Sequence, residues 1–466
     1  MSEMFAFGPQ ERVLVIGLGR SGLACVDVLR RRGVDVYATD EKDVADLAAP
    51  LAAVDGAGAR FVAPADVAAV AARVDAAVLS PGVPPTSPVV RAVNAANVPV
   101  IGEIELAYRF CRAPIVAVTG SKGKSTTTAL IGHLLRDSGL RVRVGGNIGN
   151  PLINEVLDTS ENDWVVAEVS SFQLETIRAF KPRVAVLLNV VPDHLDRYHS
   201  MDEYAEAKYR IVANQSLDDW FVGNLDDPRV AQLHWERGDS RAQARQLWFT
   251  LSGKERAAMF LRDGALMYAP PAGDPRLVPI VSRDAIALPG DHNVSNAMAA
   301  LLAALAVGCD PAALGASIAS FRSMPHRLET VAEIEGVLFV DDSKSTNPHA
   351  TIAALRSYER PIVLIAGGRA KGTAFAELGA AVRRHAKAVV AIGEAAGDIA
   401  RVSRGVKTVQ AASMRDAVAR ARELSAPGDV VLLSPACASF DMFASAEDRG
   451  EQFAAAVTAL PEPAGA

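Results

Sequence analysis

Short, continuous apolar runs alternate along the chain with longer segments in which apolar residues recur every three or four positions. In the first hundred residues the apolar runs are 12–16, 34–38 and 76–79, and a helical pattern extends to about residue 32. A strand buried on both faces of a sheet is apolar throughout, whereas a helix that covers the sheet is apolar on one side. The pattern therefore predicts an α/β protein with parallel strands.

The same alternation continues in two further segments. Apolar runs occur at 115–118, 165–168 and 184–188, and again at 337–341, 362–366, 388–392 and 430–433. At a typical domain size of about 150 residues, the 466 residues suffice for three domains. We predict domains at 1–101, 102–322 and 323–466.

Composition and charge exclude several classes of partner. Lys and Arg total 48 against 54 Asp and Glu, and no basic run is interleaved with aromatics, which argues against nucleic acid. Cys25, Cys111, Cys309 and Cys437 lack the spacing of a disulfide framework or a zinc site. The N-terminus does not resemble a secretion signal, and the longest apolar stretch, 297–309, is too short to span a bilayer. We therefore expect a cytoplasmic protein that acts without a membrane.

The clearest chemical motif is residues 119–126 (TGSKGKST), between an apolar run and a predicted helix. In such a loop successive amides wrap a polyphosphate, Lys124 reaches its terminal oxygens, and Ser125 or Thr126 ligates magnesium. Val118 stands where the general motif has a glycine, and a glycine follows two positions later. We interpret the segment as a shortened phosphate-binding loop; the alternative is an ordinary glycine turn.

A second glycine turn, residues 17–22 (GLGRSG), follows the first apolar run, and Asp40 ends the next one. Glycines let backbone amides approach a phosphate at a helix N-terminus, and an acidic residue about 20 positions further on commonly binds a ribose hydroxyl. The turn Ser80-Pro81-Gly82 follows the third run, at the edge where open α/β sheets bind ligands. These features favour a nucleotide-diphosphate site; glycines that serve only helix packing are the alternative.

Polar residues also follow the central apolar runs. Glu168 ends one run, as a magnesium-binding carboxylate beside a phosphate loop does, and Asp193 and His194 follow the next run at the same predicted sheet edge. Lys208, judged by its spacing alone, is a solvated lysine on a helix face. Asn293 precedes a very apolar helix, where it either contacts an adenine edge or caps the helix.

Three polar clusters follow strands of the third segment. They are residues 341–347 (DDSKSTN), 367–372 (GGRAKG) and 434–441 (SPACASFD). Because the carboxyl ends of parallel strands share one edge of a sheet, we expect the clusters to form a second substrate-binding rim.

Taken in order, these motifs resemble those of the Mur ligases of peptidoglycan synthesis, and the resemblance covers nearly the whole chain. Its motifs are residues 119–126, 168–171 (EVSS), 193–196 (DHLD), His292-Asn293, His326-Arg327 and 342–347 (DSKSTN). Residues 434–441 and the turn at 17–22 resemble the branch that adds D-glutamate. The Asp-Asn-Pro-Arg sequence of the branch that adds diaminopimelate does not occur.

The resemblance implies a Rossmann-like UDP-binding domain, a central P-loop ATPase-like domain and a C-terminal Rossmann-like domain that binds the amino acid. It implies ATP-dependent ligation of D-glutamate to UDP-N-acetylmuramoyl-L-alanine through an acyl phosphate. Domain closure would protect that intermediate from water. A monomer with ATP and two Mg²⁺ ions is expected.

The resemblance also assigns roles to residues of this chain. The UDP-substrate is expected at Gly19, Arg20, Ser21, Asp40, Ser80, Pro81, Gly82 and Asn147. ATP is expected at Gly120, Ser121, Lys122, Gly123, Lys124, Ser125, Thr126, Asn293, Arg327 and Asp342. The metal ions are expected on Ser125, Thr126, Glu168, His194 and a carbamylated Lys208. The expected catalytic residues are Lys124, His194, Lys208 and Glu168, with His194 also a candidate base.

The incoming glutamate is expected at Lys344, Thr346, Lys371, Ser439 and Phe440. The family has an aromatic residue after this last motif, and here the chain has Met442 followed by Phe443. Which phenylalanine lines the glutamate site therefore stays open.

Other functions compete with this interpretation. An NAD-dependent oxidoreductase would account for residues 17–40 but not for the phosphate loop. A folylpolyglutamate synthetase-like ligase, or another Mur ligase, would share the central domain. A binding protein without catalysis would not need Lys124, Glu168 and His194 together.

Overall fold

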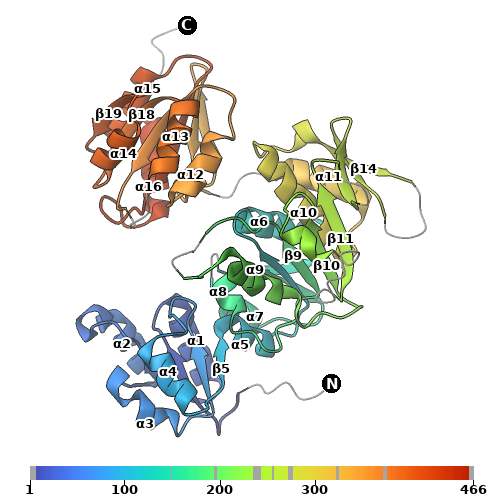
Figure 1. The fold of residues 1–466 in the computed structure, drawn as a ribbon, viewed down its shortest axis with the longest axis vertical. Helices are drawn as coiled ribbons and strands as arrows, with labels where there is room; N and C mark the ends of the chain where they lie inside the picture. Colours follow the sequence, from blue (N-terminus) through green and yellow to red (C-terminus); the bar gives the residue numbers. More distant parts are fainter. Residues whose placement is uncertain are drawn as a thin grey trace. The chain divides into compact units, whose positions relative to one another are not determined.

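The computed structural model describes residues 7–147, 150–193, 197–234, 243–253, 257–270, 276–321, 325–370 and 375–460. Within these ranges the strands form three sheets, and helices separate most of the strands, with β11 to β14 and β15 to β16 as exceptions (Figure 1). Two compact units contain them: residues 1–285 with 295–319, and residues 286–294 with 320–466. The α/β class and the three sheets predicted from the apolar runs are confirmed. The domain boundaries at 101/102 and 322/323 stay predictions.

The first sheet is parallel, in the order β3-β2-β1-β4-β5. Its strands are β1 (Arg12–Ile16), β2 (Asp35–Thr39), β3 (Arg60–Phe61), β4 (Ala76–Leu79) and β5 (Val100–Gly102). Its helices are α1 (Arg20–Arg31), α2 (Ala48–Gly56), α3 (Val67–Ala71) and α4 (Pro88–Ala95). Alternate residues of β1 enter two separate cores, Val13 and Val15 on the α1 side and Leu14 and Ile16 on the side of α3 and α4. Burial on both faces explains why every residue of β1 after Arg12 is apolar.

The second sheet has the order β14-β13-β12-β11-β10-β9-β6-β8-β7. Its strands are β6 (Ile115–Thr119), β7 (Arg141–Gly146), β8 (Asp163–Glu168), β9 (Val184–Leu187), β10 (Trp220–Asn224), β11 (Arg245–Thr250), β12 (Met259–Arg262), β13 (Ala265–Tyr268) and β14 (Val278–Ser282). Its helices are α5 (Glu103–Phe110), α6 (Lys124–Asp137), α7 (Leu152–Val156), α8 (Ser171–Leu174), α9 (Met201–Tyr209), α10 (Asp291–Val307) and α11 (Pro311–Ser320). The strands from β7 to β12 pair in parallel, whereas β12, β13 and β14 are antiparallel.

The third sheet has the order β15-β16-β20-β17-β18-β19. Its strands are β15 (Glu329–Ile334), β16 (Val337–Asp341), β17 (Ile362–Gly367), β18 (Ala386–Ile392), β19 (Lys407–Ala411) and β20 (Val430–Ala436). Its helices are α12 (Pro348–Leu355), α13 (Ala376–His385), α14 (Ala396–Val402), α15 (Met414–Leu424) and α16 (Ala446–Thr458). The predicted parallel sheet is confirmed from β16 to β19, but β15 is antiparallel to β16, which the sequence did not predict.

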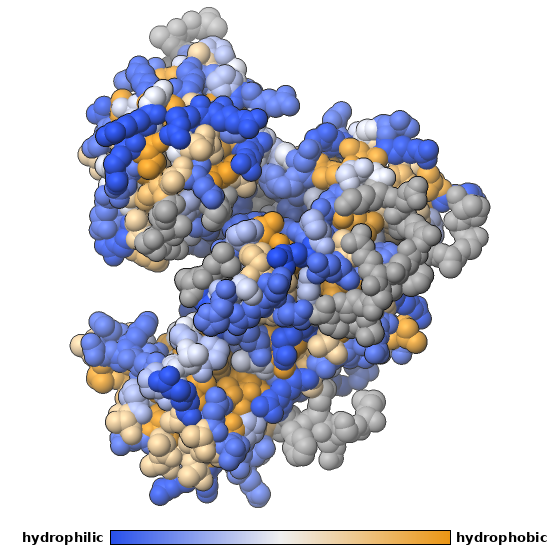
Figure 2. All heavy atoms as spheres, viewed as in Figure 1, coloured by the Kyte–Doolittle hydropathy of each residue, from blue (hydrophilic) through white to orange (hydrophobic). Residues whose placement is uncertain are grey.

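The surface and the cysteines agree with the expectations from composition. On the face drawn in Figure 2, hydrophilic residues predominate and hydrophobic ones form scattered patches. Among the described residues, no helix has the length and apolar character needed to cross a bilayer. All four cysteines lie in described segments and are free thiols, and three of them are buried.

Glu103 begins α5, directly after β5, and its side chain is buried against α7 and α8. Its side chain is 1% exposed, and its Oε1 accepts a hydrogen bond of 2.8 Å from the backbone amide of Ile153 in α7. Burial raises the pKa of this carboxyl to about 7, although hydrogen bonds from Ile153, Gln173 and Leu152 act in the opposite direction. The folded protein therefore holds a proton here that the unfolded chain releases at lower pH.

A pH-dependent loss of stability is expected from Glu103. Because its pKa is raised on folding, the folded state binds the proton more tightly, and stability falls as pH rises from about 4.5 to about 7. The loss is on the order of 3 kcal/mol, from about 1.4 kcal/mol for each unit of pKa. Glu103→Gln should remove that part of the slope in urea unfolding measured at a series of pH values. An unchanged slope would show that Glu103 ionises normally in the folded state.

Candidate active site

The loop between β6 and α6 has the backbone of a phosphate-binding turn. Gly120 has φ +154° and Gly123 has φ +84°, and Gly123 immediately precedes the first residue of α6. A Cβ atom at Gly123 would lie 2.3 Å from Oδ1 of Asn296. Asn189 holds the loop from the other side, accepting a hydrogen bond from the Lys122 amide and donating one to the Lys122 carbonyl, at 2.8 and 3.0 Å. The predicted strand, turn and helix are confirmed here.

Two lysines bring positive charge to this loop. The Nζ of Lys124 donates hydrogen bonds to the carbonyl oxygens of Gly120 and Ser121, at 2.9 and 3.1 Å, so the ammonium lies against the turn itself. The Nζ of Lys122 lies 3.0 Å from Oδ2 of Asp193. A cation held against a turn of this kind neutralises a polyphosphate wrapped by the loop amides. Ser125 and Thr126 follow in the first turn of α6 and are half-buried.

Glu168 ends β8, the strand that pairs with β6. Its side chain is 2% exposed, and Oε1 accepts a hydrogen bond of 2.7 Å from Nδ2 of Asn147. Within the described part of the chain, its Oε2 is buried and has no hydrogen-bond partner. A buried carboxylate oxygen without a donor is costly, and a divalent cation would remove that cost. This orphaned oxygen fits the magnesium expected here.

Lys208 lies in α9 and is 1% exposed, so its interpretation from spacing as a solvated lysine is wrong. Its Nζ donates to the carbonyl of Gly120 at 3.0 Å and lies 4.6 Å from the centre of the Tyr204 ring. Burial, and then the charge of Lys124, lower the pKa of Lys208 well below its ordinary value. Its surroundings therefore favour the neutral amine over the ammonium beside the phosphate loop.

Tyr204 and Asn189 are site residues that the sequence interpretation did not select. The hydroxyl of Tyr204 lies 3.1 Å from Oγ of Ser121, which donates to the carbonyl of Val191 at 3.0 Å. Burial is the main cause that raises the pKa of Tyr204 to about 12. One signal was available: Tyr204 precedes Lys208 by four residues, so both share one face of α9.

The turn after β1 and the turn after β4 lie side by side. Gly17 has φ +91°, and a Cβ atom there would lie 2.9 Å from the Cβ of Ser80. Asp40 accepts hydrogen bonds from the amides of Leu18 and Lys42, at 2.7 and 3.0 Å, so it fixes the glycine turn. The structure thus brings the expected UDP-site residues of the two turns together. Contact of Asp40 with a ribose stays a prediction.

Asp342, after β16, is the centre of a polar group in the second unit. It is 4% exposed, and its Oδ2 accepts a hydrogen bond of 2.7 Å from Oγ of Ser434. Burial raises its pKa to about 7, against the effects of hydrogen bonds from Ser345 and Ser434 and the charge of Arg327. Asn293 is also buried in this unit, and its Nδ2 donates to the carbonyl of Pro289 at 2.7 Å. Both alternatives for Asn293, contact with adenine and a helix cap, stay predictions.

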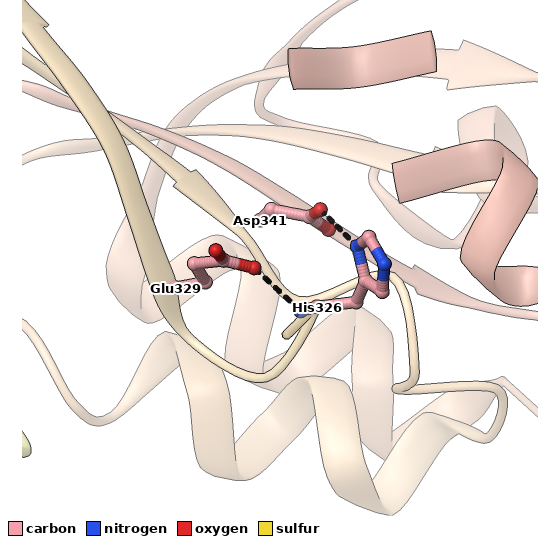
Figure 3. Close-up of side chains that lie close together, drawn as sticks. All are labelled: His326, Glu329 and Asp341. Atoms are coloured by element: carbon pink, nitrogen blue, oxygen red, sulfur yellow. Dashed lines mark hydrogen bonds and ion pairs between the residues drawn. The ribbon is translucent and has the colours of Figure 1, made fainter. Parts of the chain in front are cut away.

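The segment that carries Arg327 is pinned by its neighbours (Figure 3). Nδ1 of His326 lies 2.7 Å from Oδ2 of Asp341, and the amide of His326 donates to Oε2 of Glu329 at 2.7 Å. His326 has φ +63°, an uncommon conformation for a residue with a side chain. One nitrogen or oxygen atom from each of these three side chains lies within 4.8 Å of the others, so together they could bind a metal ion. Because they already bind one another, we interpret them as a support for Arg327.

The residues expected to bind glutamate follow β16 and β20. Lys344 lies 3.4 Å from Oε1 of Glu447 through its Nζ, Thr346 is half-buried, and Ser439 is 2% exposed. Phe440 is 65% exposed, whereas Phe443 is 8% exposed within the core of this unit. Of the two phenylalanines, Phe440 is therefore the one available to a ligand. His194 and Lys371 lie outside the described residues, so their predicted roles stay predictions.

Comparison with known proteins accounts for these motifs in order. Residues 11–102 match the MurD-like N-terminal domain of Mur ligases, residues 118–304 the Mur ligase middle domain, and residues 326–437 the glutamate ligase domain of Mur ligases. UDP-N-acetylmuramoylalanine–D-glutamate ligase of Pelotomaculum thermopropionicum is 45% identical over 456 residues, covering 97% of this chain and 98% of that one. The protein of the same name from Pelobacter propionicus is 44% identical over 97% of this chain and 99% of its own length.

Solved structures share the fold at lower sequence identity. UDP-N-acetylmuramate–alanine ligase MurC of Thermotoga maritima has a TM-score of 0.59 and 19% identity, covering 97% of this chain and 100% of that one. MurF ligase of the same organism, in complex with ADP, has a TM-score of 0.58 and 19% identity over 98% and 99% of the two chains. With relatives above 40% identity over almost its whole length, the chain belongs to the Mur ligase family.

Proposed function

We propose that this protein is the ligase that joins D-glutamate to UDP-N-acetylmuramoyl-L-alanine at the expense of ATP. The observation that carries the proposal is its similarity, over 97% of the chain, to relatives that bear the name of this enzyme. The phosphate loop with Lys124 and the buried Glu168 supports an ATP-dependent reaction. We further propose that the enzyme acts as a cytoplasmic monomer in peptidoglycan precursor synthesis.

The reaction follows from the chemistry of the substrates. A carboxylate does not react with an amine directly, because oxide is a very poor leaving group. One carboxylate oxygen of the alanyl residue attacks the γ-phosphorus of ATP, ADP leaves, and an acyl phosphate forms. The amine of glutamate then attacks the acyl carbon, phosphate leaves with the bonding electrons, and a base takes the amine proton. His194 is our candidate for that base.

The chain's own residues stabilise charge at the γ-phosphate. Negative charge spreads over the phosphoryl oxygens in the transition state, and fixed cations at those oxygens lower the barrier. Lys124 is held against the loop by two carbonyl oxygens, so it is in place before ATP arrives. The amides of residues 120–126 are further donors, and the glycines at 120 and 123 let them turn towards one ligand.

Magnesium is expected at two positions in this site. Ser125 or Thr126 with Glu168 would hold one ion, and His194 with Lys208 would hold the other. Bound magnesium neutralises phosphate charge and orients the transferred group. The orphaned Oε2 of Glu168 is the observation that fits the first position.

We propose that Lys208 is carbamylated. A neutral lysine amine attacks carbon dioxide and loses a proton, which gives a carbamate anion. Burial and the charge of Lys124 favour the neutral amine that reacts, and the neighbouring cations would stabilise the anion that replaces it. The carbamate oxygens would then serve as metal ligands.

Phosphate release tests the function directly. The purified protein is supplied with ATP, Mg²⁺ and UDP-N-acetylmuramoyl-L-alanine, together with D-glutamate, L-glutamate or no amino acid. We expect release only with D-glutamate, and a product heavier by one glutamyl residue in mass spectrometry. Turnover with another amino acid in place of D-glutamate would contradict the proposed substrate, and no turnover with either isomer would contradict the branch assignment.

A further inference from the structure

Helix α16 begins next to three loops that follow strands of the third sheet, residues 342–347, 367–370 and 434–440. We call these three loops the glutamate rim. Arg449, in its first turns, is 0% exposed and is the largest fully buried side chain among those described. Its Nε donates to Oγ of Ser343 at 2.9 Å, Nη2 to the carbonyl of Ser343 at 2.8 Å, and Nη1 to the carbonyl of Cys437 at 3.2 Å. One guanidinium therefore links the loop after β16 to the loop after β20.

The third loop of the rim lies against the same guanidinium. A Cβ atom at Gly368, which follows β17, would lie 3.3 Å from Nη1 of Arg449. The backbones of Arg369 and Ala438 exchange two hydrogen bonds of 2.9 and 3.0 Å, so this loop is joined to the one after β20. Arg449 therefore sits where all three loops meet.

The start of α16 holds the loop after β16 at further points. Oγ of Ser343 donates to the carbonyl of Ala446 at 2.7 Å, and Lys344 pairs with Glu447. At Gly450 a Cβ atom would lie 2.1 Å from Nδ1 of His326, so this glycine permits the close approach of the His326 support. The first residues of α16 thus contact the loop that carries Lys344 and Thr346.

The position of Arg449 is costly for stability. Within the described residues, no carboxylate oxygen lies within ion-pair distance of its guanidinium, and its hydrogen-bond acceptors are two carbonyls and a hydroxyl. Burial lowers the pKa of Arg449 to about 10, so the side chain remains charged at neutral pH. A buried charge needs hydrogen-bond partners, so the guanidinium favours loop arrangements in which Ser343 and Cys437 supply them.

We propose that Arg449 is a positioning residue that fixes the three rim loops in the geometry needed to bind the incoming amino acid. The inference rests on the proposed function, in that the rim is taken as the glutamate site. Lys344, Thr346 and Ser439 lie on two of the loops that Arg449 ties together. Its guanidinium is fully buried, so it acts through these loops.

The test compares Arg449→Met, Arg449→Lys and a matched control, Phe453→Leu, in the full-length protein. Phe453 is also 0% exposed on α16, but it packs in the apolar core of the unit. Losing the hydrogen bonds of a charged donor corresponds to about tenfold or more in affinity. We expect Arg449→Met to raise KM for D-glutamate by about that factor and KM for the UDP-substrate by less than about twofold. Arg449→Lys should recover part of the loss, because an ammonium can reach some of the same acceptors.

Hydrogen exchange separates this inference from the proposed function. The amides of Lys344, Ala436 and Ala438 bond to other loops of the unit, and we expect them to exchange faster in Arg449→Met than in Phe453→Leu. Equal exchange in both variants, or an equal rise of KM for every substrate, would overturn the positioning role. If the wild-type protein does not use D-glutamate, the proposed function fails, whereas the exchange comparison still decides whether Arg449 fixes the loops.

Discussion

Lys124→Ala is expected to lower kcat by about a hundredfold to a thousandfold, the usual effect of removing one preorganised electrostatic group. The Nζ of Lys124 lies against the carbonyls of Gly120 and Ser121, where the terminal phosphates of ATP would be wrapped. Charge at those phosphates increases in the transition state, so the lysine stabilises that state more than bound ATP. KM for ATP should therefore rise less than kcat falls. Steady-state phosphate release at saturating D-glutamate measures both.

Lys181→Ala is the matched control for this variant. Lys181 is also a partly exposed lysine of the first unit, but its Nζ pairs with Asp219 at 3.0 Å, away from the phosphate loop. We expect its kcat to stay within about twofold of wild type, because Lys181 precedes β9 and so lies at the sheet edge opposite the phosphate loop, which follows the parallel strand β6. Thermal unfolding should show that both variants are folded. A Lys124→Ala enzyme within about tenfold of wild-type kcat would exclude this lysine from catalysis.

The order of strands and helices was predictable where burial is complete. β1, β4 and β16 have the bounds that the apolar runs predicted, because both faces of these central strands are covered and every position except Arg12 and Asp341 is apolar. β15 and the antiparallel strands β13 and β14 escaped prediction. β15 lies at the edge of its sheet and is half-buried or exposed throughout, so it has no continuous apolar run.

Those parts of the candidate site were predictable in which binding requires a backbone conformation that only certain residues adopt readily. The glycines at 120 and 123 have φ values that favour glycine, so the phosphate loop is visible in the sequence. Arg449 and Lys208 gave no such signal. Both are charged residues of helices, where such residues are mostly solvent-exposed, and both become buried through packing against loops distant in sequence. The spacing of residues within one helix contains no information about such contacts.

Lys208→Met is expected to lower kcat by about a hundredfold or more, the effect that loss of a metal ligand or of a preorganised charge produces. The expectation follows from the proposed carbamate, since methionine keeps the volume of the side chain but has no amine to react with carbon dioxide. The free energy of unfolding should rise by on the order of 1 kcal/mol, because a buried ionisable group flanked by Lys124 is replaced by an apolar one. Kinetics and urea unfolding of the same variant test both parts.

Carbon dioxide distinguishes the carbamate from the free amine. Wild-type enzyme in buffer freed of carbon dioxide should lose activity over time and regain it when bicarbonate is added, whereas Lys208→Met should respond to neither treatment. Wild-type activity that is indifferent to bicarbonate, together with a large loss in Lys208→Met, would mean that the unmodified amine itself acts through its hydrogen bond to Gly120. Full activity in Lys208→Met would contradict a catalytic role of this buried lysine. A rise in stability with a fall in activity would instead show that the buried amine is kept for the reaction at a cost to the fold.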